Sequence, residues 1–151
     1  MIHIFDLDDT LLLSNSYNKY TDIIPNEILN RLLENIERKY IFTNGTYGHA
    51  VNSLYYMRLP LFNYIFARDN LYTNQKIKPY IDPYIYIIKS IYNNPNNHNH
   101  NIVFYDDMLE NLKTAKKLNW ITVWIKDSYD NIPGYVDYHF DNIIDALLFF
   151  R

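Results

Sequence analysis

The stretch that decides the fold reads Phe5-Asp6-Leu7-Asp8-Asp9-Thr10-Leu11, and it follows the short apolar run of residues 2–5. An apolar run of β-branched and aromatic residues is typical of a strand buried on both faces. Asp6 and Asp8, one residue apart where this strand ends, can point into one site. An ionised carboxylate such as Asp6 is a competent nucleophile toward phosphorus, and Asp8 can give a proton to a leaving oxygen. The plain alternative is an acidic turn that merely ends a strand.

Strand-like and helix-like patterns alternate along the rest of the chain. Four further apolar runs end in polar residues, and residues 138–140 are a candidate edge strand; the runs are 39–43, 62–67, 102–105 and 121–125. Helical patterns occupy residues 25–36, 48–57, 82–91, 110–118 and 141–150. In the first of them, the apolar stripe is Ile28, Leu32, Leu33 and Ile36. This alternation predicts an α/β fold with a doubly wound parallel sheet.

A second acidic pair, Asp106-Asp107, follows the fourth apolar run. In a parallel sheet, ligands bind at the carboxyl ends of the strands, so this pair is expected to lie near Asp6. Hard oxygen ligands from separate strands suit Mg²⁺, which needs few carboxylates because it keeps several waters. Asp6, the Asp8 carbonyl and Asp107 would complete such a site, with Asp106 behind them. A solvated acidic loop is the alternative, but it does not explain why both pairs follow apolar strands.

Two further segments supply groups that suit a phosphate. Thr43-Asn44-Gly45 ends the second apolar run, where a hydroxyl and free backbone N–H groups before a helix form an anion cradle. Lys78-Pro79 precedes the third helix, and a lysine there can neutralise a phosphate and the nucleophilic carboxylate together. Lys76 is a rival for this role, and a surface lysine is the plain alternative. His49 is a candidate substrate contact, weighed against a helix-start histidine that faces solvent.

Composition narrows the class of protein. The chain has 151 residues, no Cys and a formal net charge of -3. The length predicts one domain over residues 1–151, and the lack of Cys excludes a disulfide scaffold, a Cys-ligated zinc site and a cysteine nucleophile. No run approaches the roughly 18 apolar residues of a membrane span, and no signal-peptide pattern precedes the first strand. We therefore expect a cytoplasmic protein with no membrane partner.

Charge and low-complexity sequence bear on partners. The near-neutral balance gives no support for a large nucleic-acid-binding face, although it does not exclude nucleic acid as a substrate. Residues 93–101 are rich in Asn and His, and we interpret them as a mobile loop away from the chemistry.

Taken in chain order, the motifs resemble those of a known superfamily. Asp6-x-Asp8-x-Thr10, Thr43-Asn44-Gly45, Lys78-Pro79 and Asp106-Asp107 are similar to the four motifs of the haloacid dehalogenase (HAD) superfamily. Residues 41–45 followed by His49-Ala50 look like its pyrimidine 5′-nucleotidase-like branch. The resemblance implies a Rossmann-like core with strand order 5-4-1-2-3, and a Mg²⁺-dependent phosphotransfer through an aspartyl-phosphate on Asp6.

The resemblance also implies a role for each motif residue. Asp6 and Asp8 would be the catalytic pair, Thr43, Asn44 and Lys78 would bind the phosphoryl group, and Asp6, Asp8, Asp106 and Asp107 would form the metal site. The dehalogenating branch lacks the second carboxylate, because a halide leaving group needs no proton. Asp8 therefore favours a phosphomonoester hydrolase.

The expected substrate is a nucleotide-like small phosphomonoester or a phosphorylated macromolecule. A catalytically silent binding module with the HAD fold and a polynucleotide end phosphatase are the alternatives. In the nucleotidase-like branch a helical cap lies between the first two motifs, whereas residues 11–24 have room here only for a turn and a small flap. We therefore expect a capless chain with an open site, which a large substrate or a neighbouring subunit of an oligomer would cover.

Overall fold

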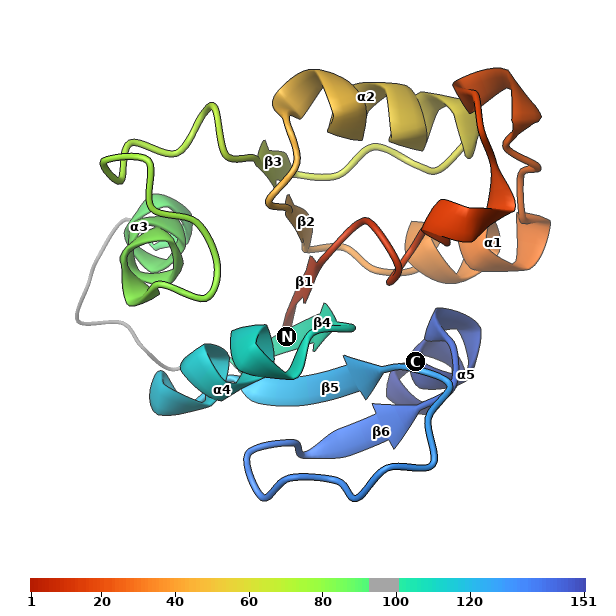
Figure 1. Cartoon of the computed structure of the whole chain (residues 1–151). Coiled ribbons are helices and arrows are strands. Elements are labelled where there is room, and N and C mark those ends of the chain that lie inside the picture. Colours follow the sequence, from red (N-terminus) through yellow and green to blue (C-terminus); the bar gives the residue numbers. More distant parts are fainter. Residues whose placement is uncertain (93–100) are drawn as a thin grey trace.

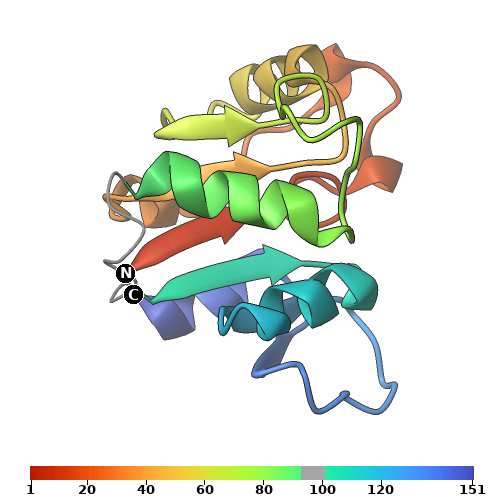
Figure 2. The same ribbon diagram turned by 90° about the vertical axis from the view of Figure 1, so that its left-hand side faces the viewer.

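The computed structural model describes residues 1–92 and 101–151, which form a central sheet with helices on both faces (Figures 1 and 2). The six strands are β1 (Ile2–Phe5), β2 (Lys39–Phe42), β3 (Tyr64–Phe66), β4 (Ile102–Asp106), β5 (Ile121–Ile125) and β6 (Tyr138–Phe140). All neighbouring strands are parallel, in the order β3-β2-β1-β4-β5-β6. This confirms the predicted doubly wound sheet. Taken from the opposite edge, it is the expected 5-4-1-2-3 order with β6 added beside β5.

The helices divide between the two faces of the sheet. On one face lie α1 (Glu27–Glu34), α2 (Tyr47–Tyr56) and α5 (Ile143–Phe150), and on the other lie α3 (Ile81–Ile91) and α4 (Leu109–Lys117). None of the helices in the described ranges combines the length and the apolar character that crossing a bilayer requires. Each face has its own apolar core, because neighbouring residues of a strand point to opposite sides. The predicted Asn-rich loop of residues 93–101 lies, apart from Asn101, outside the described residues.

The two central strands, β1 and β4, have no exposed residue. Phe5 and Tyr105 face the core under α1 and α5, where their rings stack with centroids 4.5 Å apart. Ile4 and Phe104 face the opposite core, under α3 and α4. The sheet register places Phe5 beside Tyr105, so the residues that follow both strands emerge side by side at one edge.

The orientation of α1 differs from the sequence prediction. Ile28 was expected on the inner face, but 59% of its surface is exposed, while Leu29 and Leu33 are buried. The helix begins at Glu27 because the side chain of Asn26 accepts hydrogen bonds from the N–H groups of Ile28 and Leu29. The apolar residues of this segment are too many to fix a single stripe, and packing selects the Leu29–Leu33 face.

Residues 11–24 connect the end of β1 to α1 through two short 3-10 turns, η1 (Ser14–Ser16) and η2 (Tyr20–Asp22). The η2 turn lies against α2, where the rings of Tyr20 and Tyr56 stack with centroids 5.9 Å apart. Tyr17 also stacks with Tyr20, with centroids 6.3 Å apart. The segment predicted as a small flap is therefore held against α2 by aromatic contacts.

His3 is a buried titratable group within β1, and its Nδ1 lies 2.8 Å from the hydroxyl of Tyr105. Burial, and to a smaller extent the N-terminal amine, lower the pKa of His3 to about 4. As the pH falls below the unfolded pKa of about 6.5, the unfolded chain takes up a proton that the folded chain refuses. His3 therefore makes the folded state lose stability between about pH 6.5 and pH 4.

The His3→Asn variant tests this pH dependence, because Asn keeps a polar atom for Tyr105 but does not titrate. We expect the free energy of unfolding of the wild type to fall more steeply than that of the variant when the pH is lowered from 7 to 4.5. Urea denaturation at several pH values measures both curves. Parallel curves for the two proteins would show that His3 has no lowered pKa.

Candidate active site

A tight turn at the end of β1 carries the first acidic motif. The carbonyl of Leu7 accepts hydrogen bonds from the backbone N–H groups of residues 10–12. Asp9 has a φ of 62°, a left-handed conformation that Asp adopts more readily than most residues. Its carboxylate accepts hydrogen bonds from the backbone N–H and the hydroxyl of Ser14. The turn thus folds the chain back over the end of its own strand.

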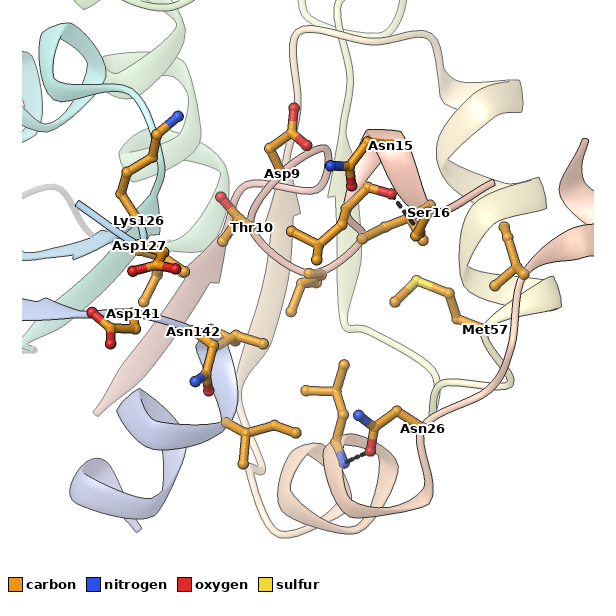
Figure 3. A pocket seen from close by; sticks show the side chains of 18 of the residues that line it. Asp9, Thr10, Asn15, Ser16, Asn26, Met57, Lys126, Asp127, Asp141 and Asn142 are labelled. Carbon is orange, nitrogen blue, oxygen red and sulfur yellow. Dashed lines mark hydrogen bonds between the residues drawn. The ribbon is translucent and has the colours of Figure 1, made fainter. Parts of the chain in front are cut away.

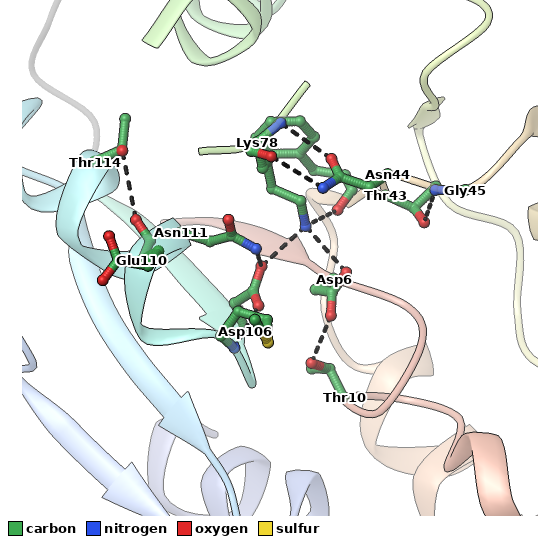
Figure 4. A network of polar contacts seen from close by, with 12 residues as sticks. Asp6, Thr10, Thr43, Asn44, Gly45, Lys78, Asp106, Glu110, Asn111 and Thr114 are labelled. Carbon is green, nitrogen blue, oxygen red and sulfur yellow. Dashed lines mark hydrogen bonds and ion pairs between the residues drawn. The ribbon is translucent and has the colours of Figure 1, made fainter. Parts of the chain in front are cut away.

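The ammonium group of Lys78 is the centre of the site (Figure 4). Its Nζ donates hydrogen bonds to Asp6 Oδ1 at 3.0 Å, to Asp106 Oδ2 at 2.9 Å and to the Phe42 carbonyl at 2.8 Å. The side chain of Lys78 is only 1% exposed. Thr10 donates its hydroxyl to the second oxygen of Asp6, at 2.9 Å. Asp6 is therefore held on both oxygens, by the ammonium and by the turn.

The side chain of Asn44 fixes the position of Lys78. Its Oδ1 accepts the backbone N–H of Lys78 at 3.0 Å, and its Nδ2 donates to the carbonyl of the same residue at 3.1 Å. The rings of Phe42 and Phe104 lie 4.8 and 5.5 Å from the ammonium, within the range of cation–π attraction. Lys76, the rival in the sequence, is instead exposed and pairs with Asp82 at 3.5 Å. Because the side chain of Asn44 is engaged with Lys78, its expected phosphate contact would have to come from the backbone.

Asp106 is buried and its oxygens are engaged with the protein. Oδ1 accepts the backbone N–H of Met108, and Oδ2 accepts hydrogen bonds from Lys78 and from Asn111 Nδ2 at 3.1 Å. Sequence analysis missed Asn111. Asn111 could have been found as a polar residue on the inner face of α4, beside the buried Leu112 and Ala115.

Asp107 is half-buried, and one oxygen each from Asp6, Asp106 and Asp107 lie within 4.8 Å of one another. Burial raises the pKa of Asp6 to about 6 and that of Asp106 to about 6. Burial and the charge of Asp106 also raise the pKa of Asp107. Burial alone would lower the pKa of Lys78, but Asp106 and Asp6 outweigh it and raise that pKa. Lys78 is thus cationic and pairs with Asp6 and Asp106, while Asp107 adds a third carboxylate to the group, so negative charge is in excess.

This donor set fits a hard divalent cation. Carboxylate oxygens are the ligands that Mg²⁺ takes in proteins, and the cation would offset the excess negative charge. Asp107 is the better direct ligand, since the oxygens of Asp106 already accept three hydrogen bonds. The carboxylate of Asp8 is not part of the group, which leaves its carbonyl as the ligand expected from the sequence.

The loop of residues 43–45 offers fewer free groups to a phosphate than the sequence predicted. Thr43 is buried, and its hydroxyl oxygen accepts the N–H of Gly45 at 3.0 Å. The N–H of Tyr47 donates to the carboxylate of Asp69 at 2.8 Å. The expectation of free N–H groups in the loop of residues 43–45 is wrong for Gly45, because Thr43 Oγ1 accepts its N–H. A Cβ at Gly45 would lie 3.3 Å from both Thr43 Oγ1 and His49 Cδ2 and 3.7 Å from Asp8 Oδ2, so this loop packs tightly against His49 and lies beside Asp8.

Asp8 and His49 meet beside this loop. Asp8 Oδ1 lies 2.9 Å from Nε2 of His49, and Nδ1 of His49 lies 2.8 Å from the hydroxyl of Tyr20. His49 is therefore not a histidine that simply faces solvent. Its contact with a substrate stays a prediction.

A cavity of about 860 Å³ lies behind the turn, between it, the end of β5 and the beginnings of α1 and α5 (Figure 3). Leu13, Ile24 and Met57 are among its apolar walls, and Thr10 and Lys126 are among its polar ones. Asp6, Lys78, Asp106 and Asp107 do not line it. Thr10 lines the cavity and also donates its hydroxyl to Asp6, so the cavity is adjacent to the buried carboxylates.

Solved structures share this fold. The chain is similar to the HAD-hydrolase YfnB from Bacillus subtilis bound to magnesium, with 17% identity and a TM-score of 0.64 over 82% of this chain and 53% of that one. It is similar to the L-2-haloacid dehalogenase from Xanthobacter autotrophicus with chloropropionic acid covalently bound (12% identity, TM-score 0.64, 83% and 58% covered). It is also similar to the haloacid dehalogenase-like family protein SP0104 from Streptococcus pneumoniae (13% identity, TM-score 0.59, 83% and 57% covered).

These likenesses show the fold of the HAD superfamily. The chain spans a little over half the length of these structures. No family model and no curated protein matches the sequence.

The buried position of Lys78 predicts a large cost for its removal. In Lys78→Met, Asp6 and Asp106 lose the cation between them, and removing one partner of a buried ion pair costs about 3–5 kcal/mol. Lys76→Met is the matched control, because an exposed pair contributes at most about 1 kcal/mol. Urea denaturation at pH 7 measures the free energy of unfolding of both variants. A similar loss in the two would contradict the central role of Lys78 in the fold.

Proposed function

We propose that the protein is a Mg²⁺-dependent phosphomonoester hydrolase that acts through an aspartyl-phosphate on Asp6. The observation that carries the proposal is the pairing of two carboxylates in different surroundings. Asp6 is buried and held by Lys78 and Thr10, whereas Asp8 is half-exposed beside the loop of residues 43–45. These surroundings support a role for Asp6 as the nucleophile and for Asp8 as the acid and base.

The reaction follows from these two positions. An oxygen of Asp6 attacks phosphorus, the bond from phosphorus to the leaving oxygen breaks, and Asp8 gives its proton to that oxygen. Asp8 then takes a proton from water as the water oxygen attacks the same phosphorus. The bond from phosphorus to Asp6 breaks, which releases phosphate and restores both side chains.

The neighbouring residues support this chemistry by charge and position. Lys78 neutralises Asp6 and the phosphoryl group, and the hydroxyl of Thr43 is placed to contact a phosphoryl oxygen. Asp6, Asp107 and the Asp8 carbonyl would hold Mg²⁺, with Asp106 orienting Lys78 behind them. When bound, Mg²⁺ would offset the repulsion between the phosphate and the carboxylates.

The same fold serves dehalogenases, so the leaving group must be argued from the site. A halide leaves without a proton, whereas an alkoxide needs one. Asp8 supplies that proton, which favours an ester of phosphate over a haloacid. We further propose that the substrate is a nucleotide-like small phosphomonoester or a phosphorylated macromolecule. The nucleotidase-like branch, the lack of a cap and an oligomeric lid stay predictions.

Hydrolysis of an aryl phosphate tests the reaction. We expect turnover with Mg²⁺ that chelation abolishes, and a loss of at least about 1,000-fold in Asp6→Asn with its circular dichroism unchanged. The control is Asp127→Asn, which removes an exposed carboxylate after β5 and should keep full turnover.

Two results would overturn the proposal. Chloride release from 2-chloropropionate without phosphatase activity would make the protein a dehalogenase. Absence of both turnover and Mg²⁺ binding would favour a binding module. A panel of nucleotides, sugar phosphates, phosphopeptides and 3′-phosphorylated DNA then separates the substrate classes.

Mg²⁺ binding is tested separately by thermal unfolding. A ligand at 100 times its Kd stabilises the folded state by about 2.7 kcal/mol, so we expect millimolar Mg²⁺ to raise the Tm of the wild type. Asp107→Asn should remove most of this rise, while Asp127→Asn should keep it. An equal rise in all three proteins would place the ion elsewhere.

A further inference from the structure

We infer that His49 and Tyr20 are positioning residues, which hold the carboxylate of Asp8 in the orientation that transfers a proton to and from the substrate. The inference rests on the proposed function of Asp8. It adds two residues that touch neither phosphorus nor the metal site, and it gives the short segment between β1 and α1 a part in the reaction.

Asp8 needs an external support because of where it lies. Its side chain is 38% exposed, on the turn after β1, and it is not part of the buried carboxylate group. An exposed carboxylate without a partner is free to change rotamer. The contact of Oδ1 with Nε2 of His49 at 2.9 Å fixes its plane. The other oxygen, Oδ2, faces Gly45 in the loop of residues 43–45.

His49 is itself held from two directions. Its backbone N–H donates to the hydroxyl of Thr46, which caps the beginning of α2. Its Nδ1 lies 2.8 Å from the hydroxyl of Tyr20, whose ring stacks with those of Tyr17 and Tyr56. The imidazole is therefore fixed by a helix on one side and by the η2 turn on the other.

The contacts fix which nitrogen of His49 carries a hydrogen toward Asp8. Oδ1 of Asp8 accepts when the carboxylate is ionised and also when its transferable proton lies on Oδ2, so Nε2 of His49 is the donor. In the neutral imidazole, Nδ1 then accepts from the hydroxyl of Tyr20. This assignment follows from the hydrogen-bond network. Each group donates toward Asp8, which is the direction that holds its carboxylate in place.

If His49 positions Asp8, the rate lost in a His49 variant should depend on the leaving group of the substrate. An aryl phosphate has a leaving group stable enough to depart with little help from an acid, whereas an alkyl phosphate depends on the proton from Asp8. Loss of the support at Asp8 should therefore slow the alkyl ester far more than the aryl ester. A purely structural role of His49 would lower both rates alike.

The experiment compares kcat for p-nitrophenyl phosphate and for glycerol 2-phosphate, both with Mg²⁺. We expect His49→Ala to lower kcat on the alkyl ester by about 10-fold to 100-fold and on the aryl ester by less than about 3-fold, with KM little changed. His49→Gln, whose amide can donate to Asp8 in place of Nε2, should restore most of the loss. Tyr20→Phe should also lower kcat more on the alkyl ester than on the aryl ester, but by a smaller factor than His49→Ala. In Asp8→Asn, the further change His49→Ala should add little.

A second measurement does not depend on turnover. The ¹⁵N NMR signals of the imidazole should show His49 as the tautomer with hydrogen on Nε2, and Tyr20→Phe should shift the Nδ1 signal. The opposite tautomer would overturn the inference. An equal loss of kcat on both esters, or an additive loss in the double variant, would also overturn it. In either case, hydrolysis by the wild type would leave the proposed function standing. No hydrolysis of either ester would overturn the proposed function and the positioning role together.

Discussion

One buried ammonium group connects most of the site. The Nζ of Lys78 contacts Asp6, the residue after β1, Asp106 at the end of β4 and the carbonyl of Phe42 in β2. A buried charge costs several kcal/mol unless it is paired and hydrogen-bonded. Because the partners lie in or directly after three different strands, this cost is offset only when the strands are assembled. Formation of the site and formation of the sheet are therefore coupled.

The need for stability alone does not explain the group of Lys78 and the carboxylates around it. Three carboxylates lie together where two of them pair with one lysine, and burial raises the pKa of Asp6 to about 6. A core built only for stability would not collect such charges, since apolar residues of similar size are often as stable or more so. Sites that break the rules of stable packing are expected where function requires it. The excess negative charge is thus the feature that points to a cation as part of the working protein.

The sequence predicted those features that depend on local pattern. The strands followed from nearly continuous apolar runs, and the parallel sheet then placed Asp6 beside Asp106. Local pattern did not decide between Lys78 and Lys76, since both lie in a loop where no periodicity defines an inner face. The contacts of Asn44 with Lys78 and of His49 with Asp8 join residues 34 and 41 positions apart, so no local pattern contains them. For α1, the apolar residues left the inner face open and packing against the sheet decided it.

The contact between Asn44 and Lys78 also affects how this chain can change in evolution. Asn44 holds the backbone of Lys78 directly, so the ammonium does not depend on the path of the chain between β3 and α3. That connection is largely exposed, with Tyr72 86% accessible to solvent. The entropy cost of closing a loop rises only slowly with its length. Whole segments can therefore be inserted into the exposed stretch of this connection beyond Asp69, which itself contacts Tyr47, and a lineage can acquire new surface there without moving the site.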